Sequence, residues 1–241
     1  MEREREGRDR EREQKRDERE RDLSPTQAQT LREVQRFRII ATRDLAAFRY
    51  RGREGMMDSD VRALLRAGLI YRHRAVDYRS QKSEKIEVLT EKPQLQKPRE
   101  VFHDAAIYPA YQRAAAKIER EGGRILSIRT DHQLKAEKAR LTNRATPGER
   151  PNGPITDLRK EEIAAELHLK VINGRTYLPD LQILYVDREG KDRHLNLEVI
   201  TDSYRGRDTR PKSAAGFSMT SAGHSTLRAK GPIKDGISPW D

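Results

Sequence analysis

The longest uninterrupted run of apolar side chains in this chain is only four residues, as at positions 183–186. A membrane-spanning helix needs about 20 consecutive, mainly apolar residues, so the sequence predicts none. Only 34% of the 241 residues are hydrophobic, whereas 37% are charged. The hydrophobic cores must therefore be assembled from amphipathic helices and short strands, in one or two domains of ordinary size.

The composition also excludes several kinds of site. The chain has no cysteine, which rules out a disulfide scaffold, a cysteine-ligated zinc finger and a cysteine nucleophile. The motifs of P-loop NTPases, zinc proteases and serine hydrolases do not occur in it. Tyr108 and Tyr111 are expected to pack in a core rather than to attack a phosphodiester, because both lie near the apolar side of a predicted helix.

Charge is distributed unevenly along the chain. Residues 1–23 contain ten acidic and nine basic residues, while the whole chain has a formal net charge of +11, so residues 24–241 carry +12. Such a surplus favours a phosphate-rich partner, above all nucleic acid. Residues 1–23 offer almost nothing to bury, and we interpret them as a mixed-charge disordered tail without a secretory signal. We expect a soluble, cytoplasmic protein with no membrane partner.

Residues 24–90 begin with three predicted helices. Ser24, followed by Pro25, predicts the start of the first helix. Thr42 can cap a second, and Asp58 or Ser59 a third. Two short strand candidates around a polar turn complete the segment. Three helices followed by a β-hairpin are typical of a winged helix-turn-helix domain, in which the third helix enters the major groove of DNA.

Basic side chains gather on the third helix and on the hairpin. Arginine is suited to DNA because its planar guanidinium donates two parallel hydrogen bonds to phosphate or to guanine. The candidate DNA-binding residues are Arg62, Arg66, Arg72, Arg74, Arg79, Lys82 and Lys85. The alternative is a helical packing domain with an ordinarily charged surface.

The remaining sequence predicts a second domain, a small α/β one. Residues 91–101 contain two prolines and indicate a linker. Residues 102–219 alternate predicted helices and strands, including a hairpin with strands at 177–186 and 194–201. Residues 220–241 show little periodicity and are interpreted as a C-terminal tail. The predicted fold class is therefore α+β.

Two acids in the predicted hairpin form a candidate metal site. Asp180 and Glu198 follow apolar neighbours on adjacent strands and are expected to point to the same end of the sheet. Two such carboxylates can hold a hard divalent cation that activates water at a scissile phosphate. In PD-(D/E)xK nucleases a lysine lies two residues after the second acid, but this chain has Ile200 there. Exposed acids at the ends of strands are the alternative.

Several stretches together resemble the replication-relaxation proteins of bacterial plasmids and integrated mobile elements. The similarity covers about residues 24–220, and the stretches that carry it are Arg99–Tyr108, Gly122–Ile125, Pro179-Asp180, Leu197–Val199 and Lys212–Phe217. The resemblance implies a DNA-binding winged helix joined to a PD-(D/E)xK nuclease-like α/β domain, with a role in plasmid replication or DNA relaxation.

The resemblance also implies roles for individual residues. Asp180 and Glu198 fall on the two strand acids, and Lys212 falls on a lysine that can replace the one missing at position 200. Gln133 stands where an acid is expected on a helix. Glu137 lies one turn further, on the same helical face, and can substitute for that acid.

Three hypotheses follow. The first is a DNA-binding protein of a plasmid or mobile element that grips double-stranded DNA through its winged helix and has a degenerate nuclease-like domain. The second is an endonuclease, dependent on Mg²⁺ or Mn²⁺, that nicks DNA with Asp180 and Glu198. The third is an adaptor that binds a protein partner of a replication or mobilisation complex.

Overall fold

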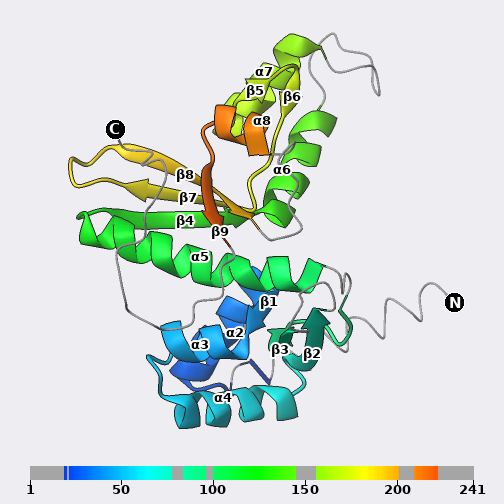
Figure 1. Ribbon diagram of the computed structural model, residues 1–241, viewed down its shortest axis with the longest axis vertical. Helices are drawn as coiled ribbons and strands as arrows, with labels where there is room; N and C mark the ends of the chain where they lie inside the picture. The colour runs from blue at the N-terminus through cyan, green and yellow to red at the C-terminus, as the bar shows by residue number, and fades with distance from the viewer. Residues whose placement is uncertain are drawn as a thin grey trace, which may run out of the picture. The chain divides into compact units, whose positions relative to one another are not determined.

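The computed structural model describes residues 19–20, 22–77, 84–95, 100–144, 156–200 and 209–221. The chain divides into two compact units, Met1–Pro109 and Ala110–Asp241. Each unit combines helices with a β-sheet, which confirms the predicted α+β class (Figure 1). None of the helices within these ranges is long and apolar enough to cross a membrane. Both predicted tails lie almost wholly outside the described residues.

Within its described residues, the N-terminal unit contains three complete helices and a three-stranded antiparallel sheet. The first strand lies between the first two helices in the sequence, and the other two strands follow the third helix. Its elements are α2 (Pro25–Phe37), β1 (Ile39–Ala41), α3 (Thr42–Phe48), α4 (Glu54–Arg66), β2 (Tyr71–Asp77) and β3 (Glu84–Thr90). The strand order is β1-β3-β2. The sequence pattern predicts the helices and the β2–β3 hairpin but not β1, because three residues are too few to show a period.

The start of α2 is determined locally. Gln27 donates its backbone N–H to Ser24 Oγ at 3.3 Å, and the backbone N–H of Ser24 donates to the Gln27 side chain at 3.0 Å. This capping box satisfies two amides at the end of the helix, so the predicted start at Ser24 is confirmed. The side chains of Leu31, Val34 and Phe37 form the buried side of α2.

α4 begins at Glu54, so the predicted start at Asp58 or Ser59 is wrong. The preceding turn passes through Gly52 at φ +78°, a conformation that glycine adopts without strain. The helix begins directly after this turn, with Glu54 favoured by the positive end of the helix dipole. The buried side of α4 consists of Met57, Val61 and Leu64.

One face of the β2–β3 hairpin contributes to a small apolar core. In the antiparallel register Ala75 lies opposite Ile86, and both side chains are buried. The core is completed from β1 and from the start of α5 (Val101–Arg120), and its members are Ala41, Ala75, Ile86, Val88, Val101 and Ala105.

α5 contains the division between the two compact units. Its first residues are buried in the N-terminal unit, where the rings of Tyr108 and Phe37 pack edge to face with centroids 5.1 Å apart. Tyr108 has no exposed surface, which confirms the expectation that it packs in a core. The helix continues through Pro109, although proline removes one helical hydrogen bond. The division falls after Pro109, whereas the predicted linker is residues 91–101.

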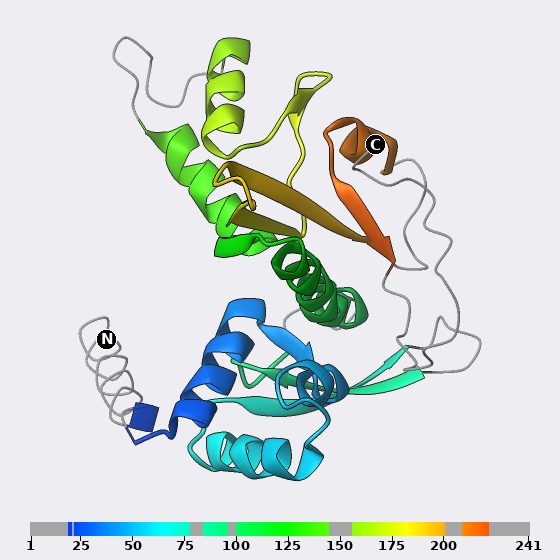
Figure 2. The ribbon, with the colours of Figure 1, turned by 90° about the vertical axis from the view of Figure 1, so that its left-hand side faces the viewer.

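The C-terminal unit is built on a four-stranded sheet with the order β4-β7-β8-β9. After α5 its elements are β4 (Arg124–Thr130), α6 (Asp131–Asn143), α7 (Asp157–Glu166), β5 (Val171–Ile172), β6 (Arg175–Thr176), β7 (Leu181–Val186), β8 (Asp192–Ile200), α8 (Thr209–Ala214) and β9 (Ser218–Ser221). β4, β7 and β8 are antiparallel, whereas β9 runs parallel to β8. Figure 2 shows the β5–β6 hairpin beside α7, and α8 leading into β9.

Several elements of this unit differ from the predicted ones. β7 begins at Leu181 rather than at residue 177. The preceding chain instead forms the β5–β6 hairpin, whose turn residues Asn173 and Gly174 both have positive φ, as type I′ turns require. α8 and β9 were not expected, and β9 extends to Ser221, inside the predicted tail at 220–241. β9 depends on pairing with β8, which its own four residues do not reveal.

Candidate functional site

The exposed side of α4 carries the two arginines that the sequence singled out. Arg62 and Arg66 are exposed, and they lie opposite the side of the helix that is buried. Arg62 Nε donates a hydrogen bond to the carbonyl of Asp58 at 3.1 Å. This bond holds the side chain back along its own helix and leaves the two terminal nitrogens of the guanidinium directed away from it.

Within the described residues, the acids near this face of α4 either have other partners or lie too far away to form an ion pair with Arg62 or Arg66. Asp60, on the same helix, accepts a hydrogen bond from the Tyr50 hydroxyl at 2.9 Å. Burial raises the pKa of Tyr50 to about 12, so the hydroxyl keeps its proton at neutral pH. Among the residues that the structure describes, no carboxylate lies within ion-pair distance of Arg62 or Arg66. Their positive charges are therefore available to an external anion.

The basic residues of the β2–β3 hairpin differ in whether a neighbouring acid neutralises their charge. Arg72, Arg74 and Lys85 are exposed. Arg72 Nε lies 3.5 Å from Glu87 Oε1 on the neighbouring strand, so part of its charge is neutralised within the hairpin. Arg74 lies directly opposite Glu87 in the register. The other two predicted DNA-binding residues, Arg79 and Lys82, fall outside the described residues.

Three of the four predicted catalytic residues meet at one end of the C-terminal sheet. Asp180 immediately precedes β7, and its Oδ2 accepts a hydrogen bond from the backbone N–H of Val199 at 2.7 Å. Glu198, the neighbour of Val199 in β8, is 1% exposed. The ammonium group of Lys212, on α8, donates to Glu198 Oε1. Lys212, which follows β8 in the sequence, therefore contacts Glu198, the second acid of the predicted site.

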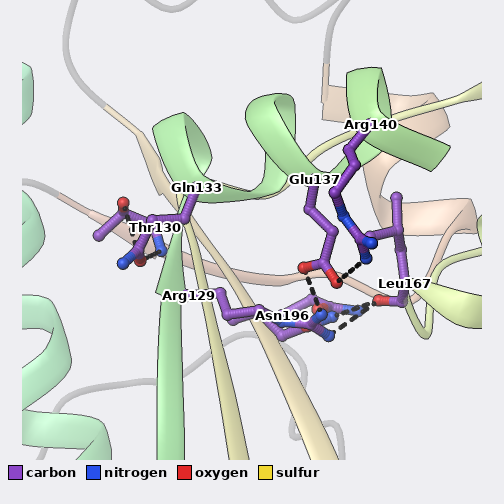
Figure 3. Close-up of polar contacts among 8 residues, drawn as sticks. Arg129, Thr130, Gln133, Glu137, Arg140, Leu167 and Asn196 are labelled. Carbon is purple, nitrogen blue, oxygen red and sulfur yellow. Dashed lines mark hydrogen bonds and ion pairs between the residues drawn. The ribbon is translucent and has the colours of Figure 1, made fainter. Parts of the chain in front are cut away.

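The fourth residue, Glu137, has a different partner. Glu137 Oε2 on α6 accepts a hydrogen bond from Arg129 Nη1 on β4 at 3.0 Å (Figure 3). Gln133, which stands where an acid was expected, accepts the backbone N–H of Thr130 at 2.9 Å and so caps α6. Thr130 pairs with Leu181, so Gln133 caps α6 beside the end of the sheet where Asp180 lies. Within the described ranges, Glu137 makes its ion pairs with Arg129 and Arg140 and not with Lys212.

Arg129 and Glu137 belong to a polar cluster around the buried Gln182 that the sequence analysis missed. Arg129, Gln182 and Asn196 lie side by side on β4, β7 and β8 because the register pairs them directly. Gln182 is completely buried; its Oε1 accepts from Arg129 Nε at 2.9 Å and its Nε2 donates to Asn196 Oδ1 at 2.8 Å. Both Gln182 and Arg129 also donate to the carbonyl of Leu167, at the end of α7 (Figure 3).

One signal in the sequence indicates this polar cluster. Gln182 interrupts an otherwise apolar strand, Leu181 to Val186, and a polar residue inside such a run must find partners if it is buried. The identity of the partners was not predictable, since Arg129 is 53 positions away.

A pair of histidines lies at the margin of the same sheet. The imidazole rings of His168, after α7, and His194, on β8, are stacked with centroids 3.8 Å apart. Burial, the neighbouring His168 and the charge of Arg129 lower the pKa of His194, against the opposing effect of Asp192. His194 therefore takes up a proton less readily than an ordinary histidine, and parallel stacked rings do not direct two nitrogens at a common metal ion.

The side chains of Asp180 and Glu198 do not by themselves complete a site for a resident Mg²⁺ or Mn²⁺ ion. These cations are bound by oxygen ligands in a near-octahedral arrangement. Asp180 is engaged by a backbone amide, and Glu198 is buried against an ammonium group. Within the described ranges, no three side chains of His, Cys, Asp or Glu are grouped so that they could hold a metal ion. We therefore derive no metal-dependent step from these residues.

Comparison with protein-family models, with curated proteins and with solved structures gave no match. The geometry of each unit is the basis for assigning a function.

Proposed function

We propose that the N-terminal unit is a winged helix that binds double-stranded DNA. The order of its elements, α2-β1-α3-α4-β2-β3, with the strand order β1-β3-β2, supports this assignment. In such an arrangement α4 is the recognition helix and the β2–β3 hairpin is the wing. An α-helix with its side chains fits the major groove of B-DNA.

The exposure of Arg62 and Arg66 on α4 is the observation that carries this proposal. Both lie on the side of the helix opposite its buried residues, where a groove can receive them. Arg74 and Lys85 are exposed on the hairpin and are placed to contact phosphates beside the groove. Each phosphate that is neutralised releases condensed counterions, which makes the affinity depend steeply on salt.

Binding to a labelled random-sequence duplex, followed by fluorescence anisotropy over a range of salt concentrations, tests the proposal. Replacing both Arg62 and Arg66 with alanine should weaken binding and reduce the slope of log K against log salt by about one per lost phosphate contact. The matched control replaces Arg32 and Arg36, two exposed arginines with the same spacing on α2. Equal losses in the two double variants would show that only net charge matters.

The same assay separates DNA binding from the adaptor hypothesis. A polyanionic protein of similar charge density replaces the duplex as the labelled ligand. If the protein is a DNA-binding protein, the duplex binds more tightly at every salt concentration, because a groove offers shape and base edges besides charge. Preference for the acidic protein would support the adaptor instead.

For the C-terminal unit we propose a scaffolding role rather than catalysis. The contacts of Asp180, Glu198 and Lys212 join β7, β8 and α8 to one another, and a buried acid that is paired in this way needs its partner. Nicking of supercoiled DNA with Mg²⁺ or Mn²⁺ tests this role. Wild type and the Asp180→Ala variant should be equally inactive. If wild type nicks DNA and Asp180→Ala does not, the hypothesis of a nicking endonuclease is supported instead.

The resemblance to replication-relaxation proteins supports a role for this DNA binding on plasmids or mobile elements. A DNA-binding winged helix joined to a nuclease-like scaffold suits a protein that acts on plasmid or mobile-element DNA in the bacterial cytoplasm, near the nucleoid. There the C-terminal unit adds contacts to DNA or recruits protein partners.

A further inference from the structure

The exposed side of α4 has two chemically different halves. Gly55, Ser59, Arg62 and Arg66 follow one another at intervals of four, three and four residues, so they form one stripe along the helix. All four are exposed. Small residues occupy the N-terminal half of the stripe, and arginines occupy the C-terminal half.

Arg62 is held in place in a way that leaves its recognition edge open. Its Nε is occupied by the carbonyl of Asp58 at 3.1 Å, so the guanidinium lies toward the N-terminal half of the stripe. The two terminal nitrogens remain, and they are the donors that contact guanine O6 and N7 together. A side chain that is already restrained loses less conformational entropy when it binds.

Arg66 is placed differently. It is the last residue of α4, one turn beyond Arg62, and the chain leaves the helix through Ala67 and Gly68, which has φ +67°. In recognition helices the base contacts come from residues nearer the N-terminal end, while flanking cations contact the backbone.

We infer that Arg62 recognises a guanine in the major groove, whereas Arg66 contacts the phosphate backbone. This inference rests on the proposed function, because it requires α4 to lie in the groove. It also assigns a purpose to the small residues: Gly55 and Ser59 let the backbone of α4 approach the base edges beside Arg62.

The experiment begins with the full chain and a randomised pool of duplexes, from which the bound sequences are selected. The affinity for the selected duplex is then compared with duplexes in which single guanines are replaced by 7-deazaguanine, which lacks the N7 acceptor. Wild type should lose about 10-fold at one guanine, because the substitution removes one of the two hydrogen bonds that the charged guanidinium donates.

Two lysine variants assign that guanine to a residue. Arg62→Lys keeps the charge but lacks the planar fork, so it should bind the selected duplex more weakly and no longer distinguish guanine from 7-deazaguanine at this position. Arg66→Lys should keep the discrimination, because a phosphate accepts either cation. Unchanged discrimination in Arg62→Lys, or equal loss in Arg66→Lys, overturns the assignment.

A third variant tests the approach of the helix backbone. A Cβ atom at Gly55 meets no atom within 4 Å, and the residue has no positive φ, so Gly55→Gln should fold normally. It should nevertheless weaken binding to the selected duplex at least tenfold if the helix lies in the groove. Unchanged affinity argues against close approach and overturns this part of the inference.

The failure of the inference differs from the failure of the proposed function. If wild type binds all duplexes alike, Arg62 recognises no base, but DNA binding stands. If wild type binds no duplex, both are refuted.

Discussion

Replacing Gln182 with leucine should destabilise the C-terminal unit, although leucine is apolar and of similar size. Gln182 is completely buried and makes hydrogen bonds to Arg129, Asn196 and the carbonyl of Leu167. Leucine removes all of them. Arg129 keeps its bond to Glu137 and the Leu167 carbonyl keeps its bond from Arg129, so the two groups that lose their best partner are Arg129 Nε and Asn196 Oδ1.

The expected magnitude follows from these two groups. Arg129 and Asn196 are partly buried, so each group that loses its partner costs about 1.5 kcal/mol, or about 3 kcal/mol together. Leucine replaces only the amide of Gln182, whose methylenes are already buried, and returns about 1 kcal/mol. The free energy of unfolding of the C-terminal unit should therefore fall by about 2 kcal/mol.

Hydrogen exchange measured on peptides from β7 and β8 is the suitable assay, because it reports on this unit separately from the N-terminal one. A loss of 2 kcal/mol should accelerate exchange through unfolding about 30-fold. The control is Gln133→Leu, the same chemical change at an exposed position of α6. It removes only the capping contact with Thr130 and should cost at most about 1 kcal/mol.

A double variant tests the physical reason directly. Asn196→Leu combined with Gln182→Leu removes both partners of one contact, so neither is left unpaired, and the Leu167 carbonyl keeps its bond from Arg129. The double variant should be destabilised by about 1 kcal/mol less than the sum of the single variants. Strict additivity, or a Gln182→Leu variant as stable as wild type, would refute the view that these contacts form one network.

Three further predictions concern local contacts and pH. Ser24→Ala should lower the free energy of unfolding of the N-terminal unit by about 1 kcal/mol in urea denaturation, whereas Ser24→Asp, which also caps, should not. Because burial raises the pKa of Tyr50 from 10.0 to about 12, the unfolded chain loses this proton first as pH rises. Stability should therefore fall between about pH 10 and 12, and Tyr50→Phe should remove this part of the fall. The pKa of His194 is lowered from 6.5 by burial and by His168, so the unfolded chain takes up this proton first as pH falls, and the C-terminal unit should lose stability below about pH 6.5. His168→Gln should raise the pKa of His194 in an NMR titration; an unchanged value would contradict the role of the stacked ring.

The elements that were predicted correctly have local causes. The start of α2 depends on Ser24 and Gln27, which are three residues apart, and the β2–β3 hairpin depends on two strands that lie close together in the sequence. α4 was placed too late because good capping residues at Asp58 and Ser59 lie inside the helix. The turn before it, with Gly52 at positive φ, lets the helix begin earlier, after the N-cap residue Arg53, whose side chain makes no capping hydrogen bond.

The candidate site was predicted only in part. Asp180 and Glu198 were expected at one end of the sheet because they follow apolar strand residues, and the register places them there. Lys212 was assigned through the resemblance alone, and its contact with Glu198 depends on how α8 and β9 return to the sheet. Glu137 was assigned to the same site by helical spacing, but Arg129 on β4 is its partner.

The amino-acid sequence alone determined which faces of the helices and strands are apolar, where α2 begins and where basic residues gather, because these properties depend on neighbours within a few positions. Only the tertiary structure decided which of the basic side chains form ion pairs within the protein and which can bind an external anion. Arg62 is free of ion pairs within the described residues and Arg72 is not, although both are arginines on a basic segment. The same holds for Gln182, whose partners come from other strands and from the end of α7. Strand register and helix packing bring such groups within hydrogen-bond distance, and neither can be read from the residues adjacent to them.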